Sequence, residues 1–148
     1  MLARELVEPF PVVALESPAL DATRLLIERR LPGLIVVDAH GAPHSVLPGS
    51  QVLRFLVPAY VQEDPSLARV YDEAHADRLC ASLAGRTVAD LLPTKRVELS
   101  VVDAGDTALE IAAIMAKLRS PLVAVVDDGR LLGAITVSRL LERLLAIP

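Results

Sequence analysis

The feature that most constrains this chain is an internal repeat, because two stretches of the sequence match each other at a constant separation of 89 residues. The matches run without a gap over Val12-Val13 with Val101-Val102, Ala19-Leu20 with Ala108-Leu109, Arg30 with Arg119, Pro32 with Pro121, and Val36-Val37-Asp38 with Val125-Val126-Asp127. Beyond a turn that is one residue shorter in the second copy, Ser50 aligns with Ser138. A repeat of this length indicates two copies of one supersecondary unit.

Each copy reads as strand, helix, strand, strand and helix, and the second copy shows this order most clearly. A strand over Val97–Val102 precedes Thr107-x-x-Glu110, which is a capping box for a helix that runs to about Arg119. Apolar, β-branched runs at Leu122–Val126 and Leu131–Thr136 flank an Asp-Asp-Gly turn and predict a hairpin. From Val137 onward the leucines recur at helical spacing, so the unit ends in an amphipathic helix.

The first copy follows the same order with weaker signals. We expect a short lead-in helix within Met1–Pro9 and a strand around Pro11–Leu15. Ser17 and Pro18 predict a helix start, with Ser17 as the N-cap, and this helix should run to about Arg30. The remaining predicted elements are strands at Leu34–Val37 and His44–Leu47 and a helix from Gln51 to about Val57.

Residues 60–86 separate the two copies and have a different sequence pattern. Leu67–Ala84 is rich in helix-forming residues, Gly85 breaks the pattern, and Thr87–Leu92 predicts a short helix that mirrors the lead-in of the first copy. The segment is too periodic for a flexible linker. We therefore divide the chain into repeat 1 over residues 1–59, a helical connector over 60–86 and repeat 2 over 87–148.

Length and composition place the chain among globular proteins. Its 148 residues are 53% hydrophobic, yet no apolar run approaches the roughly 18 residues that a membrane span needs. The charges and prolines of the first eleven residues interrupt any apolar core that a signal peptide would need, so a cytoplasmic protein without membrane insertion is expected. We interpret the excess of apolar residues as buried interface between the repeats or between subunits.

Several function classes are not expected. The net charge of −4, the 3% aromatic content and the absence of Trp argue against nucleic-acid binding. Cys80 is the single cysteine, so no disulfide framework or cysteine-based zinc site is possible. Asp72 and His75 could share a helix face, but Asp77 points elsewhere, and no metal site is predicted. The sequence carries no nucleophile elbow, P-loop or dinucleotide fingerprint, so an enzyme is not expected.

The doubled motif resembles a tandem pair of CBS domains, named after the regulatory domain of cystathionine β-synthase. The resemblance is carried by a small residue at Ala112 or Ala113, by Pro121–Asp127, and by Gly133-Ala134-Ile135-Thr136, in order and spacing. It implies an α+β fold in which two β-α-β-β-α repeats pack about a pseudo-twofold axis. It also implies two clefts, adenosine-containing ligands in many members, and homodimers formed through the helices.

The resemblance also implies which residues bind a ligand. The better cleft would use Thr136 for phosphate, Ser120, Pro121 and Leu122 near the base, and Val97 to Leu99 on the opposite wall. Apart from the resemblance, the cations Lys95 and Arg96 stand just before this strand and could extend a phosphate site. A weaker second cleft would use Pro48, Ser50 and Gln51. The implied ligands are AMP, ADP, ATP or S-adenosylmethionine, and no cofactor is required.

One position departs from the family pattern. Three residues after Thr136, where the family favours Asp, stands Arg139, and the first copy has Gln51 there. A carboxylate accepts hydrogen bonds from a ribose diol, whereas a guanidinium only donates. A cation in the first turn of a helix also opposes the helix dipole, and an anion bound by Thr136, Ser138 and Arg139 would reverse that penalty. The alternative is that Arg139 points to solvent or pairs with Glu142.

Two functions are therefore expected. The first is a homodimeric sensor that binds an adenine nucleotide or a similar anion near Thr136 and Arg139 and signals to a partner protein. The second is a ligand-free assembly module that docks on a transporter or an enzyme. Its apolar helix faces would be formed by Leu140, Leu141, Leu144 and Leu145 with Val52, Leu53 and Leu56. The sequence names neither the ligand nor the partner.

Overall fold

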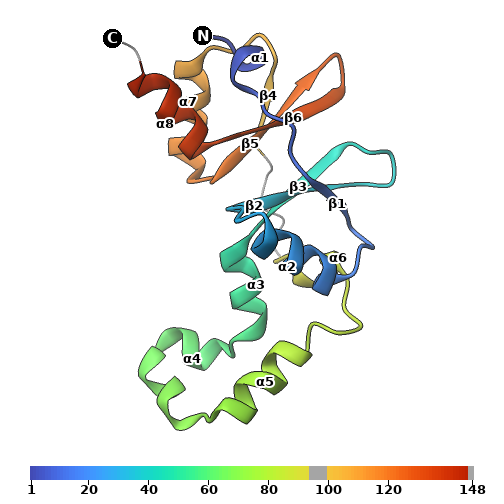
Figure 1. Cartoon of the computed structure of the whole chain (residues 1–148), viewed down its shortest axis with the longest axis vertical. Coiled ribbons are helices and arrows are strands. Elements are labelled where there is room, and N and C mark those ends of the chain that lie inside the picture. Colours follow the sequence, from blue (N-terminus) through green and yellow to red (C-terminus); the bar gives the residue numbers. More distant parts are fainter. Residues whose placement is uncertain (94–99, 147–148) are drawn as a thin grey trace.

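The computed structural model describes residues 1–93 and 100–146, and it contains two three-stranded sheets covered by helices (Figure 1). One sheet has the order β1-β2-β3 and the other the order β4-β5-β6. In each sheet the first strand runs parallel to the middle strand, and the third strand is antiparallel to it. The predicted α+β fold with two β-α-β-β-α repeats is confirmed.

Repeat 2 contains β4 (Val101–Asp103), α7 (Ala108–Leu118), β5 (Leu122–Asp127), β6 (Arg130–Thr136) and α8 (Val137–Leu145). The Thr107 hydroxyl accepts a hydrogen bond from the Glu110 N–H, as the capping box predicts. The turn between β5 and β6 has positive φ at Asp128 and Gly129, which suits a tight hairpin. Of the predicted strand Val97–Val102, residues 97–99 lie outside the described part of the chain.

Repeat 1 contains β1 (Val12–Ala14), α2 (Ala19–Glu28), β2 (Gly33–Val37), β3 (Pro43–Pro48) and α3 (Gly49–Leu56). The predicted N-cap of α2 is wrong by one residue, because Pro18 is the cap and offers no side-chain hydrogen bond. The Ser17 hydroxyl accepts instead from the Ala14 N–H, at 2.9 Å. It therefore holds the turn between β1 and α2 rather than the helix start.

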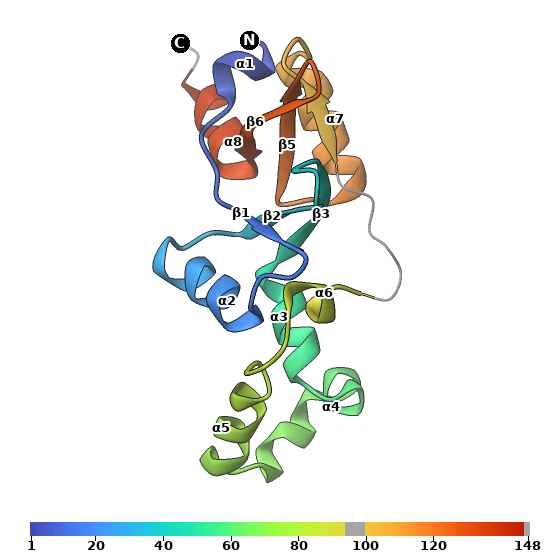
Figure 2. The same ribbon diagram turned by 90° about the vertical axis from the view of Figure 1, so that its right-hand side faces the viewer.

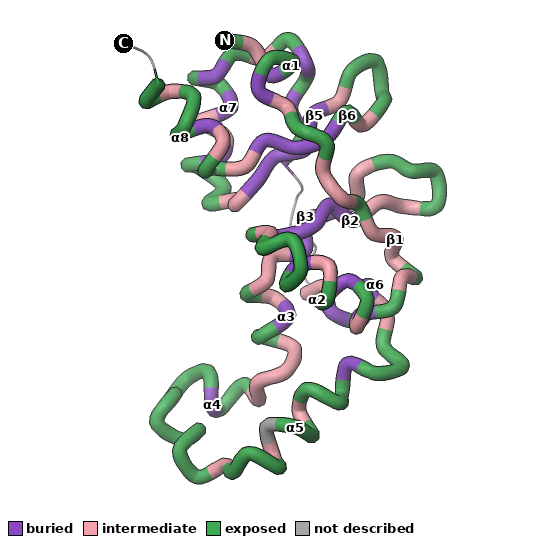
Figure 3. The backbone as a smooth tube through the Cα atoms, in the orientation of Figure 1, coloured by how far each residue is buried: buried purple, intermediate pink, exposed green. Residues whose placement is uncertain are grey.

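Three apolar clusters hold the molecule together. The buried segments of the chain follow the strands and the helices packed on them, whereas most of the connector is exposed (Figure 3). Each repeat has a cluster of its own between its sheet and its helices. The third cluster joins the two sheets, and its buried members are Ile35, Leu122, Ala124 and Ala134. These four side chains are at most 1% exposed, so the sheets meet face to face through a dry contact.

The two short lead-in helices are exchanged between the repeats (Figure 2). Ala3 and Leu6 of α1 (Ala3–Leu6) are buried in the core of repeat 2, although α1 lies in the part of the sequence assigned to repeat 1. Val88 and Leu91 of α6 (Val88–Leu91) are buried in the core of repeat 1. The division at residues 59 and 86 remains a prediction, and this exchange shows that each core takes one helix from across that division.

The connector consists of short helices. They are α4 (Ala59–Glu63), the 3-10 helix η1 (Pro65–Val70) and α5 (Glu73–Ala81), so the helix-forming stretch Leu67–Ala84 is broken between η1 and α5. Asp64 and Asp72 cap the last two helices through hydrogen bonds from Ser66 and His75 N–H groups, so each aspartate starts a new element. The connector extends away from the sheets as an arm (Figure 1). Within the described residues, no helix is long and apolar enough to cross a bilayer.

Candidate functional site

Two clefts lie where the start of the last helix of one repeat faces the helix-to-strand junction of the other repeat. The first, which we call the Thr136 cleft, has a volume of about 570 Å³. Its described lining comes from the start of α8, from the α2–β2 junction and from the segment between α1 and β1. The lining residues are Thr136 and Ser138, Arg29 to Pro32, and Glu8 to Pro11.

The second cleft, the Arg119 cleft, is built in the same way with the repeats interchanged. It has a volume of about 390 Å³, and its described lining comes from β3 and α3, from the α7–β5 junction and from Pro93. The lining residues are Val46, Pro48, Ser50, Gln51 and Arg54, Leu118 to Pro121, and Pro93. Each cleft therefore belongs to both repeats, and neither repeat alone forms one.

The predicted grouping of site residues does not match this arrangement. Thr136 and Ser138 line one cleft, whereas Ser120 and Pro121 line the other, together with the residues of the predicted weaker cleft. Leu122 pairs with Thr136 across the sheet but is fully buried in the contact between the sheets. The predicted site residues Lys95, Val97 and Leu99 lie outside the described residues.

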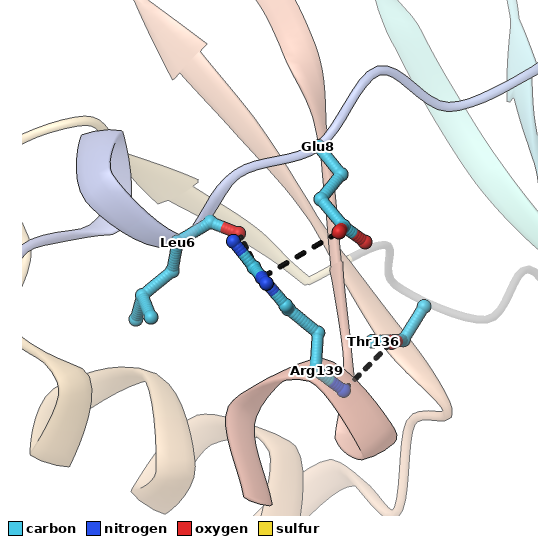
Figure 4. A network of polar contacts seen from close by, with 4 residues as sticks. All are labelled: Leu6, Glu8, Thr136 and Arg139. Atoms are coloured by element: carbon cyan, nitrogen blue, oxygen red, sulfur yellow. Dashed lines mark hydrogen bonds and ion pairs between the residues drawn. The ribbon is translucent and has the colours of Figure 1, made fainter. Parts of the chain in front are cut away.

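Arg139 is held by the segment that follows α1 (Figure 4). Its Nε donates a hydrogen bond to the Leu6 carbonyl at 3.3 Å and lies 3.6 Å from the Glu8 carboxylate. The expected exposed or Glu142-paired side chain is therefore wrong, because Arg139 is only 24% exposed and its partners are Leu6 and Glu8. Leu6 ends α1, so the guanidinium satisfies a helix-terminal carbonyl that has no partner within the helix.

Gln51 makes the equivalent contact in the other half of the molecule. Its Nε2 donates to the Leu91 carbonyl at 2.9 Å, and Leu91 is the last residue of α6. Both positions thus carry a hydrogen-bond donor that clamps the end of an exchanged lead-in helix. An ionised carboxylate at either position could not make this contact, because it only accepts hydrogen bonds and the carbonyl oxygen also only accepts them. Arg139 and Gln51, which stand where the resembled pattern has Asp, therefore have a structural role at these two helix ends.

Gly133 allows the N-terminal segment to cross the second sheet. The Glu8 N–H donates to the Ala134 carbonyl and the Ala134 N–H donates to the Glu8 carbonyl, both at 3.0 Å. A Cβ on Gly133 would lie 2.0 Å from the Glu8 backbone oxygen. Only glycine fits at this crossing, and the crossing fixes the Glu8 backbone beside the Thr136 cleft.

The two clefts differ in how their helix starts are capped. The Thr136 hydroxyl accepts from the Arg139 N–H at 3.1 Å, so the start of α8 is closed by its own side chain. Pro48 is the N-cap of α3 and supplies no side-chain hydrogen bond. The first turn of α3, at Ser50 and Gln51, therefore borders the Arg119 cleft with backbone N–H groups that no cap accepts.

The clefts also differ in charge. The described lining of the Arg119 cleft includes Arg54 and Arg119 and no carboxylate. The Thr136 cleft includes Arg29 and Arg30 together with the Glu8 carboxylate. Pro93 takes the place of Glu8 in the Arg119 cleft, because it follows the last residue of α6 by two positions as Glu8 follows that of α1. Among the described lining residues, the Arg119 cleft is therefore the more electropositive of the two.

Arg30 and Arg119 share an unusual backbone conformation. Their φ angles are 50° and 51°, in the left-handed region that is unfavourable for residues with a Cβ. Glycine is the usual residue after a helix that ends in this way. Each of these arginines lines a cleft, Arg30 the Thr136 cleft and Arg119 the Arg119 cleft.

Two carboxyl groups with altered acidity lie outside both clefts. Hydrogen bonds from the Ala42 and His40 N–H groups hold the pKa of Asp38 below its usual value. The Thr87 N–H, which donates to Asp90 at 2.9 Å, lowers the pKa of Asp90 in the same way. Both groups stabilise turns or helix starts, and neither is placed to act on a ligand in a cleft.

The apolar face predicted for assembly is only partly free. Val52 and Leu140 are buried in the cores of their own repeats, and Leu56 and Leu144 pack against those cores. Of the seven residues, Leu53, Leu141 and Leu145 are exposed, at 61%, 51% and 81%. The face that could meet another protein is therefore smaller than the sequence predicts.

The connector residues considered for metal binding have other roles. The Asp72 carboxylate caps α5 by accepting from the His75 N–H at 2.8 Å, and the His75 ring stacks on Tyr71 with centroids 4.2 Å apart. Among the described residues, no group of three or more His, Cys, Asp or Glu side chains is placed to hold a metal ion.

Comparisons with known proteins agree on one fold. The family model described as "CBS domain" matches residues 88–146. A CBS domain-containing protein of unknown function from Kribbella flavida is 61% identical, with 99% of each chain covered and a TM-score of 0.86. The CBS-pair protein CBSX2 from Arabidopsis thaliana is 21% identical, with 99% of this chain and 95% of that chain covered and a TM-score of 0.75.

CBSX2 has also been crystallised in complex with AMP. That structure is 22% identical to this chain and has a TM-score of 0.69, with 99% of this chain and 97% of that chain covered. At this identity the likeness concerns the fold alone. No curated protein matches the chain.

Proposed function

Since this chain belongs to the CBS domain family, we propose that it is a regulatory module that binds a small anionic ligand, an adenine nucleotide such as AMP, in the Arg119 cleft. The observation that carries this proposal is the charge of the cleft. Arg54 and Arg119 approach it from different repeats, and the described lining adds no carboxylate to oppose an anion.

The dimensions and the lining suit a nucleotide. A volume of about 390 Å³ lies within the range of roughly 300 to 1,000 Å³ that small-molecule sites occupy. Val46, Pro48, Leu118 and Pro121 offer apolar walls, and the Ser50 and Ser120 hydroxyls offer polar contacts. The start of α3 favours a phosphate group, because the N–H groups of Ser50 and Gln51, which follow the Gly49 N–H bonded to the Pro32 carbonyl, and the helix dipole both attract negative charge.

The complex of CBSX2 with AMP supports the choice of nucleotide. ADP, ATP and S-adenosylmethionine remain candidates, because the cleft is open to solvent and the diol acceptor of the family is replaced by Gln51. The relative position of the two repeats would carry the signal, since a ligand in this cleft touches both repeats. We infer that a homodimer passes this change to a partner protein.

The arginine at position 119 offers a sharp test. Glycine relieves the strained φ angle and removes the guanidinium, so we expect Arg119→Gly to raise the stability by about 0.5 to 1 kcal/mol. The same variant should weaken AMP binding by at least tenfold, because a hydrogen bond to a charged group contributes about 1.5 to 3 kcal/mol. Thermal unfolding and calorimetric titration with AMP, ADP, ATP and S-adenosylmethionine measure both effects.

Arg30→Gly is the matched control, because Arg30 has the same φ angle but lines the Thr136 cleft. Because it relieves the same strain, Arg30→Gly should stabilise the protein as Arg119→Gly does and raise the melting temperature by about 2 °C or more. It should leave the affinity for AMP unchanged. Equal affinity of the wild type and Arg119→Gly would contradict the proposed site. A wild-type chain that binds none of the four ligands would contradict the proposed ligand class.

A second function is favoured by the exposed leucines on α3 and α8. Leu53, Leu141 and Leu145 have the large exposures given above and belong to the helices that flank the two clefts. A ligand-free assembly module would use them to dimerise or to dock on a transporter or an enzyme. Analytical ultracentrifugation at micromolar concentration tests this candidate, because a chain that sediments as a monomer would contradict it. If the chain associates, Leu145→Ser should weaken the association.

A further inference from the structure

The ion pair between Glu8 and Arg139 brings a carboxylate of the chain itself to the wall of the Thr136 cleft (Figure 4). The Glu8 side chain is half exposed and lines the cleft, whereas the Arg139 side chain is 24% exposed and lies behind it. The guanidinium that an entering anion would seek is thus already paired with a negative charge.

The position of this carboxylate is fixed by the backbone. Two hydrogen bonds join Glu8 to Ala134, and the crossing at Gly133 leaves no room for the segment to shift toward the sheet. A tethered group acts as if it were present at millimolar concentration or more. A free anion must therefore compete with a carboxylate that never leaves the site.

We propose that Glu8 is the specificity-determining residue of the Thr136 cleft, where it acts as a built-in anion that keeps phosphate-bearing ligands from Arg139. This proposal concerns the Thr136 cleft alone, so it is independent of nucleotide binding in the Arg119 cleft. Arg29 and Arg30 also line the cleft, so the removal of one negative charge would leave a strongly basic site.

Glu8→Gln tests the proposal, because it removes the charge and keeps the size of the side chain. The probe is inorganic pyrophosphate, and titration is carried out in the Arg119→Gly background so that the other cleft contributes little. We expect Glu8→Gln to bind pyrophosphate at least tenfold more tightly than its parent. Glu16→Gln is the control, since Glu16 is exposed, lines neither cleft and changes the net charge by the same amount.

A third variant assigns the gain to Arg139. Arg139→Gln keeps a donor for the Leu6 carbonyl, as Gln51 provides one for the Leu91 carbonyl, so the fold should be retained. Added to Glu8→Gln, it should abolish the gain in pyrophosphate affinity. The proposal is overturned if Glu8→Gln binds no more tightly than its parent, if Glu16→Gln gains as much, or if the gain survives without Arg139.

Discussion

The two clefts of this molecule have the same construction and different chemistry. Both combine the helix start of one repeat with the helix-to-strand junction of the other, and both have an arginine with a left-handed φ angle at that junction. They differ at single positions, because Glu8 faces one cleft where Pro93 faces the other, and Thr136 caps one helix where Pro48 leaves the other uncapped.

This difference shows how the two halves of a duplicated fold can form clefts of different charge. Both repeats keep a hydrogen-bond donor at the same structural position. Gln51 and Arg139 each bind the last carbonyl of an exchanged lead-in helix. The residues that set the charge have diverged. The two clefts thus share one architecture and differ in their charge.

The largest effect is expected at the crossing of the N-terminal segment. Gly133→Ala should lower the free energy of unfolding by at least about 3 kcal/mol, because the new Cβ would overlap the Glu8 backbone. The aligned residue of repeat 1 is Ser45, which already has a Cβ. Chemical denaturation should show Ser45→Ala to cost less than about 1.5 kcal/mol, the contribution of one hydrogen bond. Equal losses would show that the crossing has no special role.

The next effect transfers the carboxylate from one cleft to the other. Pro93→Glu places a negative charge in the Arg119 cleft, at the position that corresponds to Glu8. The affinity for AMP should fall about tenfold, which equals roughly 1.4 kcal/mol. Pro93→Gln is the uncharged control and should bind AMP nearly as the wild type does. If both variants lose affinity equally, shape rather than charge distinguishes the clefts.

A smaller effect concerns the helix caps. Thr136→Val keeps the branched shape but removes the hydroxyl that accepts from the Arg139 N–H, so the stability should fall by about 1 kcal/mol. The converse variant, Pro48→Thr, offers α3 a cap of the same type and should stabilise the protein by a few tenths of a kcal/mol or more. Thermal unfolding compares the two, and a stable Thr136→Val variant would show that the cap of α8 is dispensable.

The smallest effect is a pH dependence at α6. The pKa of Asp90 is lowered in the folded state, so its contribution to stability is present above pH 3.8 and is lost as the pH falls through the folded-state pKa. Asp90→Asn should therefore be less stable than the wild type at pH 7, and the difference should shrink below pH 3.8. Urea unfolding at pH 7 and pH 3 measures it. Asp77→Asn, which removes the same charge at an exposed helix position, is the matched control variant.

Much of the fold could be predicted from the sequence, because its signals are local. Thr107 and Glu110 mark a helix start, and Asp128-Gly129 marks a tight turn, whatever surrounds them. The exchange of α1 and α6 could not be predicted. Leu6 and Leu91 would give the same apolar pattern in either core, so only the path of the chain in space decides which core each enters.

The sequence predicted two clefts, but it did not predict which residues line each of them. Ser120 and Thr136 belong to the same repeat and were predicted to share one site. In the structure, however, Ser120 lines the Arg119 cleft and Thr136 lines the Thr136 cleft. Arg139 has its backbone partner 133 residues away, at Leu6, so no local rule could identify the contact. The anomaly of a cation in the first turn of α8 was a usable signal, and the structure shows its protein partners, the Leu6 carbonyl and Glu8, at the far end of the chain.

The exchange of lead-in helices has a consequence for how such a chain could arise. A single copy of this unit would carry a helix whose hydrophobic side chains fit a groove on a neighbour, and it would carry a groove that only a neighbour's helix could fill. Two such units would complete each other's cores by exchanging their helices, as in a domain-swapped dimer. Fusion of two copies turns that encounter between chains into an intramolecular step, and afterwards each copy is free to diverge while the pair stays together.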